Sequence, residues 1–161
     1  MADKHRNPDR IDRRILRELQ GDGRIPYVEL AERVGLSTSP CLERVRKLER
    51  GGWITGYHAR LAADRLGAGL LVFVEISLDY TRGGEKVFED FRRAVTRWPE
   101  IQECHLVSGD FDYLLKIRIA DMAAYRALLG EIVRDLPGVR DSRSLVAMET
   151  IKESGEIAVP E

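Results

Sequence analysis

The sequence predicts an α+β protein, with a winged-type helix-turn-helix followed by a ferredoxin-like βαββαβ domain. Apolar residues recur at helical spacing up to about residue 53. From about residue 67, apolar runs of strand length alternate with amphipathic helices. With 161 residues the chain can form two small domains. We expect the helical domain at 1–53, a connecting strand or linker at 54–66, the ferredoxin-like domain at 67–150 and a C-terminal tail at 151–161.

Three helices are predicted in the first domain. Asn7 is expected to cap the first helix and Pro8 to occupy its first turn. A second helix is expected from about Tyr27 to Val34, and Ser37 is expected to cap a third that runs to Arg50. Each helix is followed by glycine, which suits the backbone conformation at a helix end.

The junction between the second and third helices predicts a helix-turn-helix. Small Ala31 lets the two helices cross closely, Gly35 makes the turn and Leu36 covers it. The third helix begins with polar uncharged residues, and cations follow one turn later, as in a recognition helix. The turn favours this interpretation over the solvated face of a plain three-helix bundle. The expected DNA contacts are Ser37, Thr38 and Ser39 in the groove, and Arg44, Arg46 and Lys47 on phosphates or base edges.

Charge is distributed unevenly along the chain. The net charge is only −1, but residues 1–60 carry 13 Lys and Arg against 9 Asp and Glu. The remaining 101 residues carry 13 against 18. The helical domain is therefore the one suited to approach a polyanion.

Four strands and two helices are predicted in the second domain. The strands are expected at Leu70–Leu78, Ile101–Val107, Tyr113–Ile119 and Val139–Met148. One helix should cover Gly84–Trp98, and Asp121 should cap another that ends near Leu136. Each helix is followed by an apolar residue and a proline, and this internal repeat is what two crossed βα units would produce. The residues expected to face inward are Val87, Phe88, Phe91, Val95 and Trp98, then Met122, Tyr125, Leu129, Ile132, Val133 and Leu136.

The first strand of this domain is apolar on both faces. Helices cover only one face of a βαββαβ sheet, so Leu71 and Phe73 on the other face need a further partner. Pairing of two subunits supplies that partner, and it also suits recognition of paired DNA half-sites.

The loop before the third strand could hold an amino acid. Backbone N–H groups around Gly109 can bind a carboxylate, while Asp110 or Asp112 can bind an ammonium group. The alternative is an ordinary polar hairpin turn, in which Asp and Gly are common.

Other classes of protein find little support. No apolar run is long enough to cross a bilayer, and the N-terminus does not resemble a secretory signal. Two cysteines cannot form a disulfide framework, so we expect a cytoplasmic protein. His5, His58 and His105 form no metal-binding pattern, and adjacent Cys104 and His105 would point to opposite faces of a strand. We predict neither a metal site nor an enzyme.

Several long motifs resemble the Lrp/AsnC family of transcription regulators. They are DRIDRRIL, ELAERVGLS, PCLERVRKLE, LLVFVEI and IQECHLVSGDFDYLLK, and they occur in the family's order from about Ile11 to Met148. The resemblance implies a sensor domain of the type called regulation of amino acid metabolism, which is similar to ACT domains. It implies dimers that assemble further, commonly into octamers, with an amino acid bound where dimers meet. By this resemblance the effector site would include Leu106, Gly109, Asp112, Tyr113, Met122, Leu145, Val146 and Ala147.

The leading hypothesis is a sequence-specific DNA-binding regulator of amino-acid metabolism genes that responds to leucine or a related amino acid. It would bind double-stranded DNA at palindromic or paired half-sites and would need no cofactor. One alternative is a nucleoid-type architectural protein that bends DNA with little sequence preference. Another is a regulatory subunit that controls an enzyme through the βαββαβ domain.

Overall fold

The computed structural model describes residues 7–82 and 84–160, so His5 lies outside the described residues. The chain divides into two compact units. One extends to Arg60 and also includes the tail from Lys152 onward, while the other comprises Leu61–Ile151. No helix among the described residues is both long and apolar enough to span a membrane.

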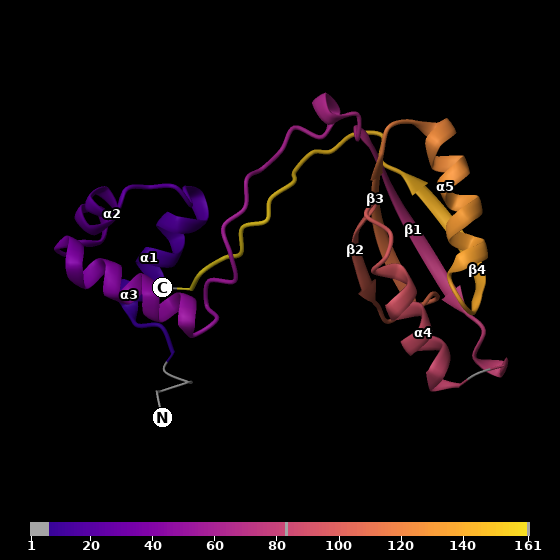
Figure 1. Ribbon diagram of the computed structural model, residues 1–161, viewed down its shortest axis with the longest axis horizontal. Helices are drawn as coiled ribbons and strands as arrows, with labels where there is room; N and C mark the ends of the chain where they lie inside the picture. Colours follow the sequence, from indigo (N-terminus) through magenta and orange to yellow (C-terminus); the bar gives the residue numbers. More distant parts are fainter. Residues whose placement is uncertain (1–6, 83, 161) are drawn as a thin grey trace. The chain divides into compact units, whose positions relative to one another are not determined.

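Three helices form the first unit: α1 at Arg10–Gly21, α2 at Tyr27–Val34 and α3 at Thr38–Arg50 (Figure 1). Each helix contributes one apolar face to a common core, as the helical spacing predicted. The loop between α1 and α2 adds a residue that the periodicity did not identify, Ile25. The buried core residues are Ile15, Ile25, Leu30, Ala31, Val34, Cys41, Val45 and Leu48.

The start of α1 differs from the prediction. Asp9, not Asn7, caps the helix, and its carboxylate accepts hydrogen bonds from the N–H groups of Ile11 and Asp12, both at 2.9 Å. The Asp12 side chain accepts one in return from the Asp9 N–H at 3.1 Å. This reciprocal capping box satisfies the N–H groups of Asp9, Ile11 and Asp12 at the start of the helix.

The turn between α2 and α3 has the predicted geometry. Gly35 ends α2 with a φ of +76°, in the left-handed region that glycine adopts readily. The Leu36 N–H then donates to the Ala31 carbonyl at 2.8 Å, which closes the turn. Ser37 occupies the N-cap position of α3, but its side chain makes no capping hydrogen bond, contrary to the prediction.

Residues between α3 and the second unit's sheet form no strand, and their one regular turn is the short 3₁₀ helix η1 at Asp64–Leu66. The second unit contains β1 at Leu70–Leu78, α4 at Glu85–Val95, β2 at Ile101–Leu106, β3 at Tyr113–Ile119, α5 at Met122–Asp135 and β4 at Val139–Val146. A second 3₁₀ turn, η2, covers Tyr80–Arg82. The order is βαββαβ, as predicted, although α4, β2 and β4 end one to three residues earlier than the pattern indicated.

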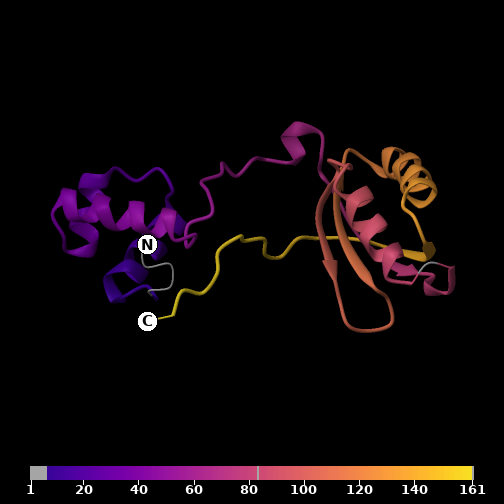
Figure 2. The same cartoon turned by 60° about the horizontal axis from the view of Figure 1, so that its bottom comes forward.

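The four strands form one sheet in the order β2-β3-β1-β4, and every neighbouring pair is antiparallel. This is the predicted ferredoxin-like order. Both helices lie on the same face of the sheet (Figure 2). Val72, Val74 and Ile76 of β1 pack against them, whereas Phe73 and Glu75 alternate onto the face that no helix covers.

The inward face of α5 is partly mispredicted. Tyr125, Ile132 and Leu136 are buried as expected, but Met122 and Val133 are exposed and Leu128 is buried instead. The helix carries apolar residues on more than one face, so periodicity alone could not choose the stripe that packs on the sheet.

Candidate nucleic-acid interface and ligand site

The surface of α3 opposite its core face is polar and exposed. Cys41, Val45 and Leu48 point inward, so positions half a turn away face solvent. Ser37, Thr38 and Ser39 are all exposed at the N-terminal end of this helix. The helix begins with polar side chains that project freely, which is the arrangement needed to approach the edges of bases.

Two predicted cations lie on this exposed surface. Arg46 is exposed, and no ion pair involving it occurs within the part of the chain that the structure describes. Lys47 pairs with Glu43 one turn earlier at 3.2 Å, and both side chains are about two-thirds exposed. Such an exposed pair contributes at most about 1 kcal/mol, so the Lys47 ammonium can exchange Glu43 for a phosphate.

Arg44 lies on the flank of α3 that faces α1. Its Nη1 atom is 2.7 Å from Asp9 Oδ2 and 2.7 Å from Asp12 Oδ1, and its side chain is 31% exposed. These hydrogen bonds raise the pKa of Arg44. Burial alone would raise the pKa of Asp9, but the hydrogen bond from Arg44 and the backbone N–H of Asp12 lower it. Arg44 thus joins α3 to the capping box of α1.

The loop between β2 and β3 is fastened to the end of β1. The Asp112 N–H donates to the Ile76 carbonyl at 2.9 Å, and Asp112 Oδ2 accepts from the Leu78 N–H at 2.7 Å. The other carboxylate oxygen accepts from the Tyr80 hydroxyl. Gly109, at the tip, has a φ of +143°, and no neighbour would meet a side chain there. The loop is therefore open at its tip and rigid at its base.

Tyr113 lies beneath this loop, against α4. Its ring stacks on Phe91 at a centroid distance of 4.5 Å, and it is 2% exposed. Its hydroxyl is buried and, among the residues that the structure describes, has no hydrogen-bond partner. A buried hydroxyl without a partner costs about 1–3 kcal/mol, so this atom is a source of local instability.

The structure separates the predicted effector residues into two groups. Strand register places Tyr113 opposite Ile76, whereas Val146 lies opposite Val72 and Ile119 opposite Leu70. Along β1, four residues separate Ile76, the partner of Tyr113, from Val72, the partner of Val146, which is about 13 Å. The groups are Leu106, Gly109, Asp110, Asp112 and Tyr113 at one end, and Met122, Leu145, Val146 and Ala147 at the other.

Comparisons with known proteins match both units. A model described as winged helix-turn-helix DNA-binding matches residues 8–55, and one described as the Lrp/AsnC ligand binding domain matches residues 71–157. The second match alone covers more than half of the chain. The chain belongs to the Lrp/AsnC family. It is a transcription regulator with a DNA-binding domain and an amino-acid-binding domain, and not an enzyme.

Related proteins resemble the chain over nearly its whole length. The leucine-responsive regulatory protein of Escherichia coli K12 is 60% identical over 163 residues, covering 99% of this chain and 98% of the relative. A Neisseria meningitidis transcriptional regulator in complex with L-Met gives a TM-score of 0.88 at 36% identity, covering 94% and 97% of the two chains. A feast or famine regulatory protein of Mycobacterium tuberculosis, complexed with L-methionine, gives 0.85 at 35% identity, covering 96% and 100%.

Sequence reasoning missed two features of these sites. The partner of Arg44 lies on another helix, and only the spacing of Asp9 and Asp12, typical of a capping box, could have indicated it. The contact of Asp112 with Tyr80 and Leu78 depends on strand register, for which the sequence carries no local signal. Among the described residues, no cluster of three potential metal ligands occurs.

Proposed function

We propose that this protein is a sequence-specific transcription regulator whose DNA binding or assembly responds to a free amino acid, leucine or a related apolar one. The exposed face of α3 carries the DNA half of the proposal. The amino-acid half is supported by relatives whose names include a response to leucine or a complex with L-methionine. The effector is a small molecule, and no cofactor takes part. Acting on the chromosome, the regulator would work in the cytoplasm.

On the DNA side, we assign base-edge contacts to Ser37, Thr38 and Ser39, and phosphate contacts to Arg46 and Lys47. The contacts of Arg44 with Asp9 and Asp12 support a positioning role, in which it fixes the orientation of α3. Its two carboxylate partners neutralise it, so it has less charge to offer a phosphate.

On the effector side, we propose that the site lies between two subunits, each of which supplies one of its two ends. The loop around Gly109 supplies backbone N–H groups for the carboxylate, and Asp110 and Asp112 supply the partner for the ammonium. A carboxylate has about four lone-pair positions, so Asp112 can accept a further bond beside those it already makes. Leu106 of the loop group and the distant group of Met122 and Leu145–Ala147, brought by the second subunit, would enclose the apolar side chain.

This division requires a homo-oligomer. The face of the sheet that α4 and α5 leave uncovered carries Leu71 and Phe73, and we propose that a second subunit packs there. A dimer would present two α3 helices to paired or palindromic half-sites. Further assembly to an octamer or larger is expected from the family.

The experiment is a titration of DNA from upstream of the protein's own gene and of random DNA, at fixed salt, with and without leucine or methionine. We expect about 10³-fold preference for the specific DNA and a change in affinity with one amino acid. A ratio near one would favour the architectural alternative. Asp112→Ala should abolish the response to the amino acid while leaving DNA binding, and an unchanged response would refute the loop assignment.

A further inference from the structure

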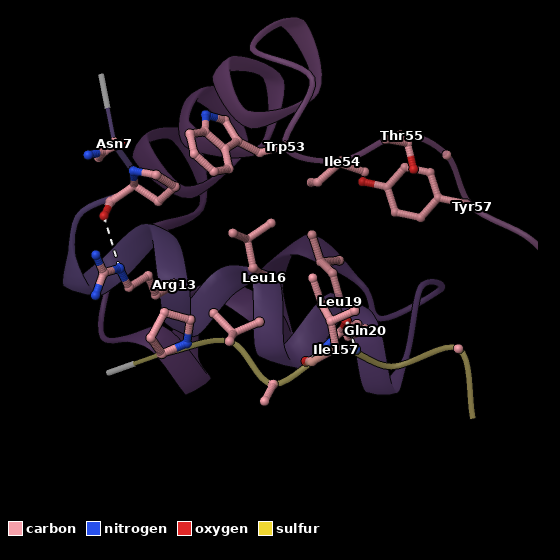
Figure 3. Close-up of a pocket in the computed structure, with 16 residues that line it drawn as sticks. Asn7, Arg13, Leu16, Leu19, Gln20, Trp53, Ile54, Thr55, Tyr57 and Ile157 are labelled. Atoms are coloured by element: carbon pink, nitrogen blue, oxygen red, sulfur yellow. Dashed lines mark hydrogen bonds between the residues drawn. The ribbon is translucent and has the colours of Figure 1, made fainter. Parts of the chain in front are cut away.

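A groove of about 640 Å³ lies on the DNA-binding unit, between α1, the segment Trp53–Tyr57 and the C-terminal tail. Leu16 and Leu19 of α1 lie between Trp53 and Ile54 on one side of the groove and Ile157 of the tail on the other (Figure 3). The groove lies outside both the exposed face of α3 and the loop around Gly109. Neither DNA contact nor effector binding explains it.

The tail is bound to α1 through its backbone. The Gln20 side chain donates to the Ile157 carbonyl at 2.9 Å and accepts from the Ile157 N–H at 2.8 Å. Arg17 donates to the carbonyls of Val159 and Pro160, at 3.3 and 3.0 Å. The Ile157 side chain is 73% exposed, so these contacts recognise an extended backbone.

The opposite wall of the groove is attached to α3. The Tyr57 hydroxyl donates to Glu49 of α3 at 3.0 Å, and burial together with that carboxylate raises the pKa of Tyr57 to about 12. Arg60, three residues further along, donates to the carbonyl of Glu153 in the tail at 2.8 Å. The linker is therefore held on the recognition helix, the tail on α1, and the two segments are joined to each other.

These two segments have neighbouring origins in the sensor unit. The linker enters at Leu70 of β1, and the tail leaves after Val146 of β4. The two strands pair, and the Ala147 N–H donates to the Leu71 carbonyl at 3.0 Å. Leu145–Ala147, at the root of the tail, are also among the residues assigned to the apolar part of the effector site.

We propose that the groove is the docking site of the chain's own segment Gly155–Pro160, and that this docking is the second connection through which the sensor acts on the DNA-binding unit. The proposal rests on the proposed function, whose effector it assumes. A ligand that displaces Leu145–Ala147 moves the root of the tail. With the tail docked, that displacement reaches α1, while the linker holds α3 through Tyr57. A free tail transmits nothing.

Docking is tested with Trp53, which lines the groove. A Trp98→Phe background makes Trp53 the one tryptophan, since the chain contains two. Ile157→Pro removes the N–H that donates to the Gln20 side chain, and Gln20→Ala removes both hydrogen bonds between Gln20 and the Ile157 backbone. Each should shift Trp53 emission to that of a chain ending at Ile151. Ile157→Ala is the matched control, because that side chain is mostly exposed, and it should leave the emission unchanged. Equal emission from all the variants and the intact chain would overturn the docking.

The peptide KESGEIAVPE, added to the chain ending at Ile151, should restore the emission at millimolar concentration, the order of effective concentration that a short tether provides. The same peptide with proline at position 157 should not restore it.

The connection is tested by DNA titration with and without leucine or methionine, using the intact chain, Ile157→Pro and Ile157→Ala. We expect the amino acid to change the DNA affinity of the intact chain and of Ile157→Ala, but not that of Ile157→Pro. An unchanged response in Ile157→Pro would overturn the connection. Absence of a response in the intact chain would instead contradict the proposed function, and the Trp53 result would stand.

Discussion

Arg44 and Arg46 lie two positions apart on α3, and the structure gives them different environments. Arg44 contacts Asp9 and Asp12 at 2.7 Å, whereas Arg46 is exposed on the face assigned to DNA. Replacing Arg44 by Met keeps much of the side chain's apolar stem but leaves two carboxylates without their cation. Replacing Arg46 by Ala removes a cation that has no structural partner within residues 7–82 and 84–160. We therefore expect Arg44→Met to lower stability and Arg46→Ala to weaken DNA binding.

The magnitudes follow from burial. An exposed ion pair contributes about 0.2–1 kcal/mol, and Arg44 makes two charge-assisted hydrogen bonds to half-buried carboxylates. Because solvent still screens these groups, we expect Arg44→Met to lower the free energy of unfolding by about 1–2 kcal/mol. Arg46→Ala should change it by less than about 0.5 kcal/mol. Loss of one phosphate contact should reduce the slope of log affinity against log salt by about 0.9.

Two assays separate these effects. Urea unfolding followed by Trp53 emission in the Trp98→Phe background reports the DNA-binding unit, and DNA titration at several salt concentrations reports phosphate contacts. Arg126→Ala, an exposed arginine of α5, is the control and should change neither result. The assignment is refuted if Arg44→Met lowers the salt slope without destabilising the unit, or if Arg46→Ala destabilises it with an unchanged slope.

Three further predictions concern stability. Gly138→Ala should destabilise the sensor unit by more than about 2 kcal/mol in urea unfolding, because the φ of Gly138 is +75° and a Cβ there would lie 2.2 Å from Val87. Adding Val87→Ala should recover part of the lost stability. Full stability of Gly138→Ala alone would contradict the geometry. Tyr113→Phe should be neutral or stabilise by about 1 kcal/mol in the same assay, since it removes a buried hydroxyl that has no partner among the described residues. A clear loss of stability would show that the hydroxyl has a partner. The pKa of Asp9 is lowered in the folded chain, so its contribution to stability is complete above the ordinary pKa of 3.8 and is lost as the pH falls through the folded pKa. The loss of unfolding free energy in Arg44→Met should therefore be constant near neutral pH and become smaller below about pH 4. A loss that became larger in acid would contradict the pairing of Asp9 with Arg44.

The sequence predicted the elements of this fold better than their ends and contacts. The turn at Gly35, the cap at Asp121 and the strands β1 and β3 were predicted because each depends on neighbouring residues. The cap at Asp9 was missed because Asn7 followed by Pro8 is also a good helix start. Periodicity places a stripe only approximately, and α5 buries Leu128 rather than Val133.

Contacts between distant residues could not be predicted from one sequence. The ion pair of Arg44 spans 35 positions to Asp9, and the bond from Gln20 to Ile157 spans 137. Neither side of these pairs has a local signal that names its partner. The same limit applies to the predicted effector residues. The sequence assigned the loop and the strand to one effector site, and their separation along the sheet follows from strand register.

Calorimetric titration of leucine or methionine into the protein, free and bound to its specific DNA, tests the coupling of the two units most directly. If the amino acid changes DNA affinity by some factor, thermodynamic linkage requires DNA to change the affinity for the amino acid by the same factor. A regulator in which the sensor controls α3 predicts a difference of about 5-fold or more between the two titrations. Identical amino-acid affinities, measured with and without DNA, would contradict coupling between the sites.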